Sequence, residues 1–497
     1  MNHLVFARES GKLSGRRFAA SIATDLLRSL EYYPHLRFDG RFSISGPLND
    51  FSPANEAHYG GINSLVVDKF QARLMVSGGC DGSVKVWNLE ACKNSSRPFV
   101  FRPDIAVPRA RVGNRRKGHS SGISSVDFDP FDPFCFYTSS FDETVKQWQP
   151  DRKEATACFD LQAPVNCFAV SPVSSDKLLA CAIGSPLVRL LDPRSGLSSR
   201  MLLSTDGTVL ALSWSPVNER LLCSGHADGT VKIWDTRRTL KPLAMLDQDD
   251  SLGIIHRFDH ALLSGIPWTR ERHIRSSAHA HNGPVNGISW TDDGNYIVTA
   301  GLDQKIRLWD AATGAHIRVN FKTPIYNKTT KALKLLISPG CLMRHSREIL
   351  YMPNGMDLLA VELHTGTVVA QLCPPADHVL PSEPMGAKRR RTRQDTRSLV
   401  NRAQLTQSTA HRVRDIAWRG SGGENLPLGC EMGGGDSHGA IYAAYGDGTI
   451  KAFMPKLPGP LEGDDDMDLG VGEREAGRKR KRQGINNVYQ SLMTGLR

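Results

Sequence analysis

Residues 207–238 read GTVLALSWSPVNERLLCSGHADGTVKIWDTRR, and their pattern predicts the fold. Two runs of alternating apolar and polar residues stand on either side of Ala227-Asp228-Gly229. Alternation with a period of two places one set of side chains on one face of a sheet, so each run is predicted to be a strand. Asp-Gly between such runs is a strong hairpin signal, because glycine readily adopts a positive φ. The stretch therefore predicts an antiparallel hairpin.

Variants of this sequence pattern recur along the 497-residue chain, which indicates a repeat protein. A lone four-stranded sheet has two apolar faces and too small a core, so such repeats are expected to stack against one another. Closing the stack into a ring buries both faces of every sheet. The third copy is degenerate and the sixth is weak, but seven copies can be counted, at 60–87, 118–148, 165–192, 207–238, 281–310, 349–361 and 413–453.

The clearest copies share four residue types at fixed spacing. A Ser or Thr lies ten residues before a Trp, an Asp lies six before it, and a His precedes the first strand. This pattern, with Asp235 directly after Trp234, resembles the WD repeat of β-propellers. The resemblance implies an all-β, seven-bladed WD-repeat β-propeller with an N-terminal helical docking segment. The complete sets are His58, Ser77, Asp81 and Trp87; His119, Thr138, Asp142 and Trp148; and His281, Thr299, Asp303 and Trp309.

One hydrogen-bond network would explain this spacing. A buried Trp indole N–H needs an acceptor, and a Ser or Thr hydroxyl can accept it while donating onward to the His. The Asp can accept from the His and from amides of its own turn. We therefore expect these groups to be structural, although they look like a catalytic relay. The fourth copy has Ser224, Asp228 and Trp234 but carries Thr205 in place of the His, so its Ser and Asp need other partners.

Composition limits the class of protein. With 40% hydrophobic and 23% charged residues, the chain is typical of a soluble globular protein. No apolar run reaches the roughly 20 residues that span a membrane, and residues 1–30 lack the apolar segment of a secretory signal. The ten cysteines form no Cys-x-x-Cys pair, so we expect reduced thiols, an intracellular compartment and no metal. Neither a phosphate-binding loop nor a nucleophile elbow is present, so we expect no cofactor and no enzymatic activity.

The formal net charge is +11, and two compact basic clusters contribute to it. Neither cluster has interleaved aromatic residues for base stacking, so nuclear localisation is favoured over direct nucleic-acid contact or plain solvated charge. We predict that at least one cluster acts as a nuclear signal and that the protein is nuclear. The cluster residues are Lys388, Arg389, Arg390 and Arg391, and Arg478, Lys479, Arg480, Lys481 and Arg482.

The segment before the first repeat has its own pattern. Residues 17–31 place apolar side chains at three- and four-residue steps, which predicts an amphipathic helix that ends at Tyr33-Pro34. This segment would pack on the propeller rim, form a frayed terminus, or dock another protein. A strand between Phe42 and Ala57 is expected to complete the last blade. The predicted organisation is a docking segment at 1–40, a propeller at 41–457 with a basic insertion at about 374–410, and a disordered tail at 458–497.

The stretch Trp234-Asp235-Thr236-Arg237 carries one feature beyond the general repeat. An Arg two residues after the Asp resembles the signature of propellers that serve as substrate receptors for cullin-4 ubiquitin ligases. In that family the Arg lies near the surface that docks the propeller adaptor, the large subunit of the damaged-DNA-binding protein. The alternative is an ordinary solvent-exposed arginine that follows a strand.

Compared blade by blade, the chain resembles the Cockayne syndrome WD-repeat family. The likeness rests on residues 60–63, 138–142, 171–174, 246–248, 281–283 and 285–287. It implies a non-catalytic substrate receptor of a cullin-4 RING ubiquitin ligase in transcription-coupled nucleotide excision repair, which engages a CSB-type repair ATPase at stalled RNA polymerase II. The adaptor-binding residues implied by the match are Leu4, Phe6, Arg8, Phe18, Ile22, Leu26 and Arg237.

This resemblance leads to a testable expectation and leaves one alternative. A Phe18→Asp, Leu26→Asp double variant is expected to lose the adaptor while its thermal stability changes little. The chain departs from the family in the long connection from Tyr32 to Ala57, in the insertion near Lys388 and in its C-terminal tail. The alternative function is a nuclear scaffold in ribosome assembly or chromatin complexes, because basic loops and nuclear signals suit it equally well.

Overall fold

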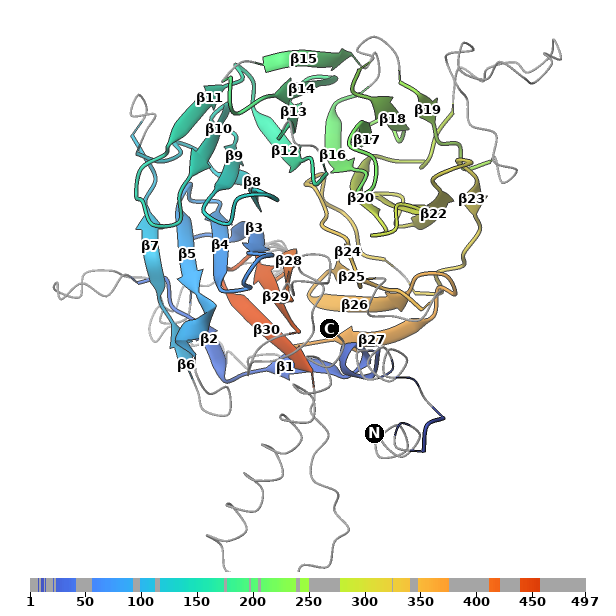
Figure 1. Ribbon diagram of the computed structural model, residues 1–497, viewed down its shortest axis with the longest axis horizontal. Helices are drawn as coiled ribbons and strands as arrows, with labels where there is room; N and C mark the ends of the chain where they lie inside the picture. The colour runs from blue at the N-terminus through green and yellow to red at the C-terminus, as the bar shows by residue number, and fades with distance from the viewer. Residues whose placement is uncertain are drawn as a thin grey trace, which may run out of the picture.

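In the computed structural model, seven four-stranded antiparallel sheets follow one another around a ring, which makes the fold a seven-bladed β-propeller (Figure 1). The predicted all-β fold and the number of blades are confirmed. The structure describes residues 8, 10–12, 14, 21, 24–41, 56–92, 99–111, 117–173, 177–195, 198–203, 207–237, 242–249, 278–323, 325–339, 347–374, 411–420 and 439–455.

Each copy of the repeat forms one blade. Blades one to three consist of β3 (Ile62–Val67), β4 (Leu74–Gly79), β5 (Val84–Asn88) and β7 (Pro103–Val107); β8 (Ile123–Phe128), β9 (Phe136–Ser140), β10 (Thr144–Trp148) and β11 (Ala157–Asp160); and β12 (Val165–Val170), β13 (Leu179–Ile183), β14 (Leu187–Leu191) and β15 (Ser198–Leu203). A short 3-10 helix, η1 (Leu89–Ala91), follows β5.

Blades four to seven continue the ring. They consist of β16 (Val209–Trp214), β17 (Leu221–His226), β18 (Val231–Asp235) and β19 (Ala244–Met245); β20 (Val285–Trp290), β21 (Tyr296–Gly301), β22 (Ile306–Asp310) and β23 (His316–Ile317); β24 (Leu336–Ile337), β25 (Ile349–Asn354), β26 (Asp357–Glu362) and β27 (Val368–Leu372); and β28 (Val413–Arg419), β29 (Ala440–Tyr445), β30 (Ile450–Pro455) and β1 (Leu30–Tyr33).

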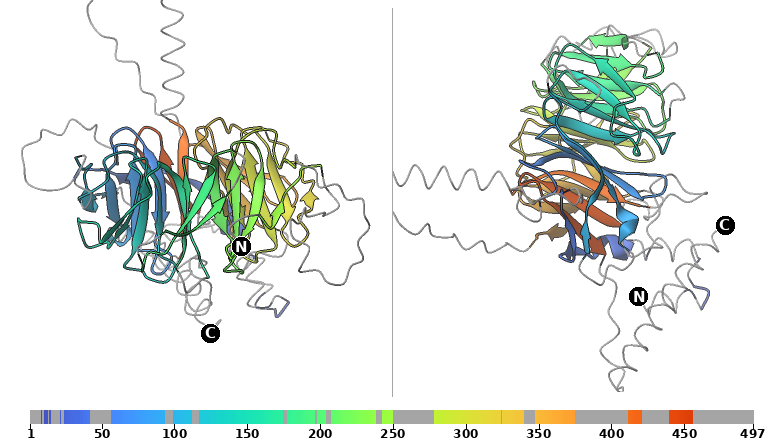
Figure 2. Two further views of the ribbon diagram at one scale, coloured as in Figure 1. Left: turned by 90° about the horizontal axis from the view of Figure 1, so that it is seen from above. Right: turned by 90° about the vertical axis from the view of Figure 1, so that its left-hand side faces the viewer.

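The turns gather on two faces of the ring, as the side views in Figure 2 show. Within a blade the first strand lies innermost, and successive strands run antiparallel towards the rim. The turn between the second and third strands therefore lies on the same side as the connections between blades, and we call this side the upper face. The turns between the first and second strands, and between the third and fourth, form the lower face.

The hairpin at Ala227-Asp228-Gly229 forms as predicted, between β17 and β18. Gly229 has a φ of +90°. A Cβ at this position would collide with the carbonyl oxygen of His281 in the next blade. Glycine is therefore required here both for the backbone conformation and for the close approach of two blades. The degenerate third copy and the weak sixth copy also form complete blades, because their central strands β13 and β25 are buried along their whole length.

The last blade is completed by the N-terminal segment, but by other residues than predicted. β1 pairs with β30, and the ring of Tyr32 lies 6.1 Å from that of Phe453. The predictions of a helix through residue 31 and of a closing strand after Phe42 are therefore wrong. In the described part of this segment residues 8, 21 and 24–28 are helical, the helix ends at residue 28, and residues 42–55 lie outside the described residues. The exposed edge of β30 needs hydrogen-bond partners. Residues 30–33 supply them as a strand, so the helix ends earlier than the apolar pattern predicts.

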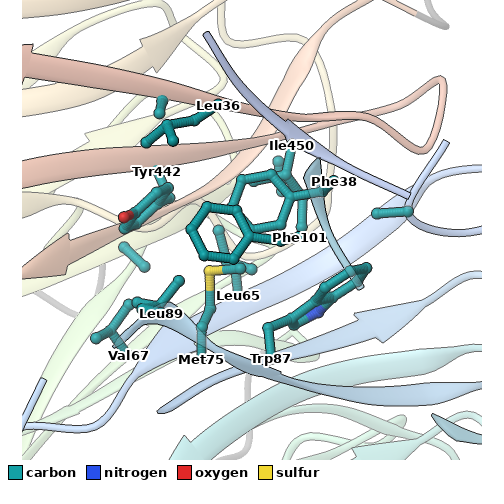
Figure 3. Close-up of a cluster of buried hydrophobic side chains, with 14 of the residues drawn as sticks. Leu36, Phe38, Leu65, Val67, Met75, Trp87, Leu89, Phe101, Tyr442 and Ile450 are labelled. Carbon is teal, nitrogen blue, oxygen red and sulfur yellow. The ribbon is translucent and has the colours of Figure 1, made fainter. Parts of the chain in front are cut away.

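A second strand of the N-terminal segment ties blade seven to blade one. β2 (Leu36–Phe38) pairs in parallel with β6 (Phe99–Phe101), outside the first blade. Figure 3 shows Phe38 in the cluster formed there by side chains of both blades. Its ring stacks on Phe101 at 4.8 Å and meets Trp87 and Tyr442 edge-on at 5.4 and 5.8 Å. We call residues 30–39 the N-terminal strap, because β1 lies on one blade and β2 on the next.

Candidate protein-binding surfaces

Blade two holds the network that most resembles a catalytic relay. Trp148 Nε1 donates to Thr138 Oγ1 at 2.8 Å, and Thr138 Oγ1 lies 2.7 Å from His119 Nε2. His119 Nδ1 lies 3.0 Å from Asp142 Oδ2. Thr138, His119 and Trp148 are completely buried, so no substrate can reach them. The arrangement satisfies buried polar groups between the two upper-face turns and the blade core.

The protonation of this network follows from its burial. Desolvation lowers the pKa of His119, so the ring is neutral and its Nδ1–H donates to Asp142. Burial by itself would raise the pKa of Asp142, but hydrogen bonds from His119, Thr144 and the Ser120 amide outweigh it and hold that pKa well below its usual range. Both ring nitrogens of His119 are therefore occupied within the protein, Nδ1 by Asp142 and Nε2 by the Thr138 hydroxyl, and the buried ring has a structural role.

Blades one and five repeat this arrangement with small differences. In blade five, Trp309 Nε1 lies 2.9 Å from Thr299 Oγ1, and His281 lies 2.8 Å from Thr299 and 2.9 Å from Asp303. In blade one, Trp87 donates to Ser77 at 2.9 Å and His58 lies 2.6 Å from the same hydroxyl. Ser83 stands between His58 and Asp81, with its hydroxyl 2.8 Å from His58 Nδ1 and 2.7 Å from Asp81 Oδ1. Burial would raise the pKa of Asp81, but the nearby His58 ring, 3.6 Å away, and hydrogen bonds from the hydroxyl and amide of Ser83 lower it to about 2.

The fourth blade lacks the His before its first strand, and another His, which was not predicted from the sequence, contacts its Ser. Trp234 Nε1 donates to Ser224 Oγ at 2.7 Å, and Ser224 Oγ lies 2.9 Å from Nε2 of His226. The other ring nitrogen of His226 lies 3.1 Å from the carbonyl oxygen of Gly207. Asp228 accepts from the amide and hydroxyl of Thr230. A His two residues after the Ser therefore replaces the one missing before the first strand.

Of the residues predicted to dock an adaptor, Leu4, Phe6, Phe18 and Ile22 lie outside the described residues. Arg8 is exposed. Leu26, by contrast, is 9% exposed and belongs to a core cluster between blades six and seven that includes Tyr351 and Phe453. The neighbouring Leu27 carbonyl accepts a hydrogen bond of 2.9 Å from Tyr351 Oη. The expectation that Leu26→Asp would change thermal stability little is incompatible with this burial.

Arg237 lies on the lower face, where β18 ends. Its guanidinium donates to both carboxylate oxygens of Asp235, at 2.9 and 3.2 Å, while 59% of the side chain stays exposed. Asp39 and Arg41, which have the same spacing, form the same paired contact. The Asp thus holds the Arg in one orientation at the surface. The structure does not bring Arg237 together with residues 24–33, because Arg237 belongs to blade four and those residues to blades six and seven.

Exposed apolar side chains on the lower face were not singled out from the sequence. They occupy the turns between the first and second strands of blades two, three and four. The Thr236 amide donates to the Arg220 carbonyl at 3.0 Å, so the Arg237 turn is joined to one of these turns. The side chains, with their exposed fractions, are Phe131 (44%), Phe134 (72%), Val173 (40%) and Val217 (62%). Together with Arg237 they give the lower face apolar contact points and an oriented cation.

The upper face has a hollow of about 260 Å³. Its lining comes from three places in the chain: the connection before β24, the turn between β25 and β26, and the residue before β28. No sequence pattern linked these positions, because they are separated by up to 86 residues and belong to different turns. The lining residues are Tyr326, Lys328, Gly355, Met356 and Arg412.

Several predictions concern groups that the structure only partly describes. Both basic clusters, Lys388–Arg391 and Arg478–Arg482, lie outside the described residues. All eight cysteines in the described part are free thiols. Where side chains are described, no group of three or more His, Cys, Asp or Glu is placed to hold a metal ion. In the same part of the chain, no helix combines the length and apolar character needed to cross a membrane.

Comparison with known families identifies the repeat. The family described as "WD domain, G-beta repeat" matches residues 51–88, 112–149, 199–235 and 273–310, which correspond to blades one, two, four and five. The fold is a WD-repeat β-propeller. The three WD repeats with a complete His, Ser or Thr, Asp and Trp set lie in these segments, and so does the fourth blade with its substitute His226.

Similar proteins fall into two groups by name. The chain is 28% identical over 335 residues to the WD repeat-containing protein ATCSA-1 of Arabidopsis thaliana, covering 58% of this chain and 74% of that one. It is 26% identical over 317 residues to the ribosome biogenesis protein YTM1 of Phaeosphaeria nodorum, covering 60% and 62%. The alignment to YTM1 of Saccharomyces cerevisiae strain S288c is shorter, 29% over 197 residues, with 39% and 36% covered. The chain therefore spans less than two thirds of these ribosome biogenesis proteins. None of these names denotes an enzyme.

Proposed function

We propose that this protein is a non-catalytic substrate receptor of a cullin-4 RING ubiquitin ligase that acts in transcription-coupled nucleotide excision repair. The observation that carries the proposal is the likeness to ATCSA-1 over 335 residues. The Trp-Asp-x-Arg stretch at 234–237, which begins in β18 of a complete blade, supports it. A WD-repeat propeller suits such a role, because its two faces can hold two partners at once while its core only maintains the shape.

The lower face supports an adaptor-docking role. Arg237 is fixed by Asp235 with most of its side chain exposed, and Phe134 and Val217 offer apolar area on the same face. Oriented arginines and exposed apolar residues are typical of protein interfaces. In this proposal the residues from Leu4 to Ile22 contact the adaptor, the large subunit of the damaged-DNA-binding protein. Buried Leu26 anchors that segment to the propeller.

The mechanism would be proximity. A receptor that holds a target on one face and the ligase adaptor on the other raises the effective concentration of the target near the ligase. A CSB-type repair ATPase at a stalled RNA polymerase II would be engaged by the surface left free, and the basic clusters at 388–391 and 478–482 would direct the protein to the nucleus. Catalysis belongs to the partner subunits.

The test is co-purification of the adaptor and cullin-4 with the tagged full-length chain. An Arg237→Glu variant should recover much less adaptor, and a Phe18→Asp, Ile22→Asp variant should recover almost none. Lys305→Glu is the matched control, since Lys305 is an exposed cation in the upper-face turn of blade five. Equal adaptor recovery by wild type and both variants would refute the docking role.

A second candidate is a nuclear scaffold in ribosome assembly, which the alignments to the YTM1 proteins favour. The same purification from nuclear extract separates the two functions. Ligase adaptor and RNA polymerase II in the eluate, increased after ultraviolet damage, would support the repair function. Pre-ribosomal proteins in their place would support the scaffold and overturn the ligase proposal.

A further inference from the structure

The upper-face hollow combines two cations with two exposed apolar side chains. Lys328 and Arg412 lie on its lining, with Tyr326 at 58% exposure and Met356 at 50%. Neither Lys328 nor Arg412 has a carboxylate partner among the described residues. Carboxylates on the adjoining turns are engaged elsewhere: Asp357 accepts from Gln371 at 2.6 Å, and Asp447 lies 3.2 Å from His411. The two cations are therefore available to an outside anion.

The lining is held rigidly by buried side-chain amides. Asn327 Nδ2 donates to Asn286 Oδ1 at 2.6 Å, and Asn286 Nδ2 donates to the Thr329 carbonyl at 2.8 Å. Both asparagines are buried. The Tyr326 amide donates to Asn354 Oδ1 at 2.6 Å, which joins the segment to the end of β25. Because these bonds fix residues 326–329 before any ligand arrives, little ordering is left to oppose binding.

Two more cations lie further along the same two segments. Arg414 lies two residues after Arg412, at the start of β28. Arg414 Nη1 donates to Asn63 Oδ1 at 3.0 Å, and Lys331 Nζ donates to the same oxygen. The Lys331 side chain touches solvent, yet desolvation and then repulsion from Arg414 lower its pKa to about 8. Two cations that share one neutral acceptor add to the positive charge of the two segments that line the hollow.

We propose that this hollow binds an acidic peptide segment of a partner protein. Carboxylates of the peptide pair with Lys328 and Arg412, and an apolar side chain of the peptide packs against Tyr326 and Met356. The volume fits a few peptide side chains, being near the roughly 300 Å³ at which ligand pockets begin. A nucleic-acid duplex fits less well, because its uniform phosphate charge would leave the two apolar side chains without a counterpart. The inference does not depend on the ligase role.

Fluorescence anisotropy of the purified full-length chain tests the site. The probe is a fluorescein-labelled peptide of sequence GEELFEEG at low ionic strength. A Lys328→Glu, Arg412→Glu variant should bind it at least roughly tenfold more weakly, which corresponds to 1.4 kcal/mol. Lys69→Glu, an exposed cation on the lower face, is the matched control and should bind like wild type. Thermal melts of both variants show that they are folded.

Each further binding measurement tests one part of the proposal. A peptide with Gln in place of every Glu should lose binding, and equal binding would overturn the role of the acidic groups. Met356→Ala should weaken GEELFEEG but not GEEGGEEG, whereas equal effects on both would overturn the apolar contact. Unchanged affinity in the double charge reversal would overturn the site itself. Tighter binding of a labelled DNA duplex that depends on Lys328 and Arg412 would assign the hollow to nucleic acid instead.

Discussion

Replacing Phe38 with Ala should release the N-terminal strap. The Phe38 side chain is 1% exposed and contacts Phe101, Trp87 and Tyr442 between blades seven and one. Removing a buried phenylalanine ring costs about 3–5 kcal/mol. Among the described strands, β2 pairs only with the short β6. The substitution should therefore lower the free energy of local opening of the strap before it lowers the stability of the whole ring.

The magnitude can be measured by hydrogen–deuterium exchange. At a factor of ten for every 1.4 kcal/mol, 3–5 kcal/mol corresponds to roughly 100- to 4,000-fold faster exchange of the β1 and β2 amides. Phe134→Ala is the matched control, because its ring is 72% exposed on the lower face and its loss should leave those amides unchanged. Wild-type exchange of β1 and β2 in Phe38→Ala would refute the role of this cluster in closing the ring.

The other predictions concern buried polar and apolar groups. Burial lowers the pKa of His119 below its ordinary 6.5, so the unfolded chain takes up a proton that the folded ring does not. Thermal melts should therefore show stability falling as the pH drops below about 6.5, with a smaller fall in His119→Gln. His226→Ala leaves the Ser224 hydroxyl without its acceptor and should lower the free energy of unfolding in urea by about 1–3 kcal/mol; an unchanged value would show that another group replaces the ring. Leu26→Asp should lower the melting temperature far more than Leu26→Met, because it places a charge in the core between blades six and seven; equal melting temperatures would contradict that burial.

Prediction from the sequence succeeded where the physical signal is local. The Asp-Gly turn at 228–229 and the alternation on either side of it require only neighbouring residues, so the hairpin could be predicted from the chain alone. The ten-residue spacing of Ser or Thr before Trp likewise reflects two paired strands, β4 with β5 in blade one. Repeating this unit seven times leads to the ring, because each blade must cover the apolar faces of its neighbours.

The strap illustrates why the closing strand could not be predicted. Residues 17–31 do carry a helical apolar pattern, yet Leu30 and Tyr32 lie in a strand. The unpaired edge of β30 decides between the two, and that edge exists only after blade seven has formed from residues 413–455, far along the chain. Leu26 is misread for the same reason: an apolar stripe shows that a face is buried, but not whether a partner protein or the propeller covers it.

The repeat of paired strands, with His, Ser or Thr, Asp and Trp at the spacing of a blade, can be predicted from the amino-acid sequence. What lies between blades is set by the three-dimensional arrangement. It joined Tyr326, Met356 and Arg412 around one hollow, replaced a missing His with His226, and gave the closing role to residues 30–33. Local spacing determines each blade because its hydrogen bonds are short in sequence, whereas contacts between blades depend on the closure of the ring.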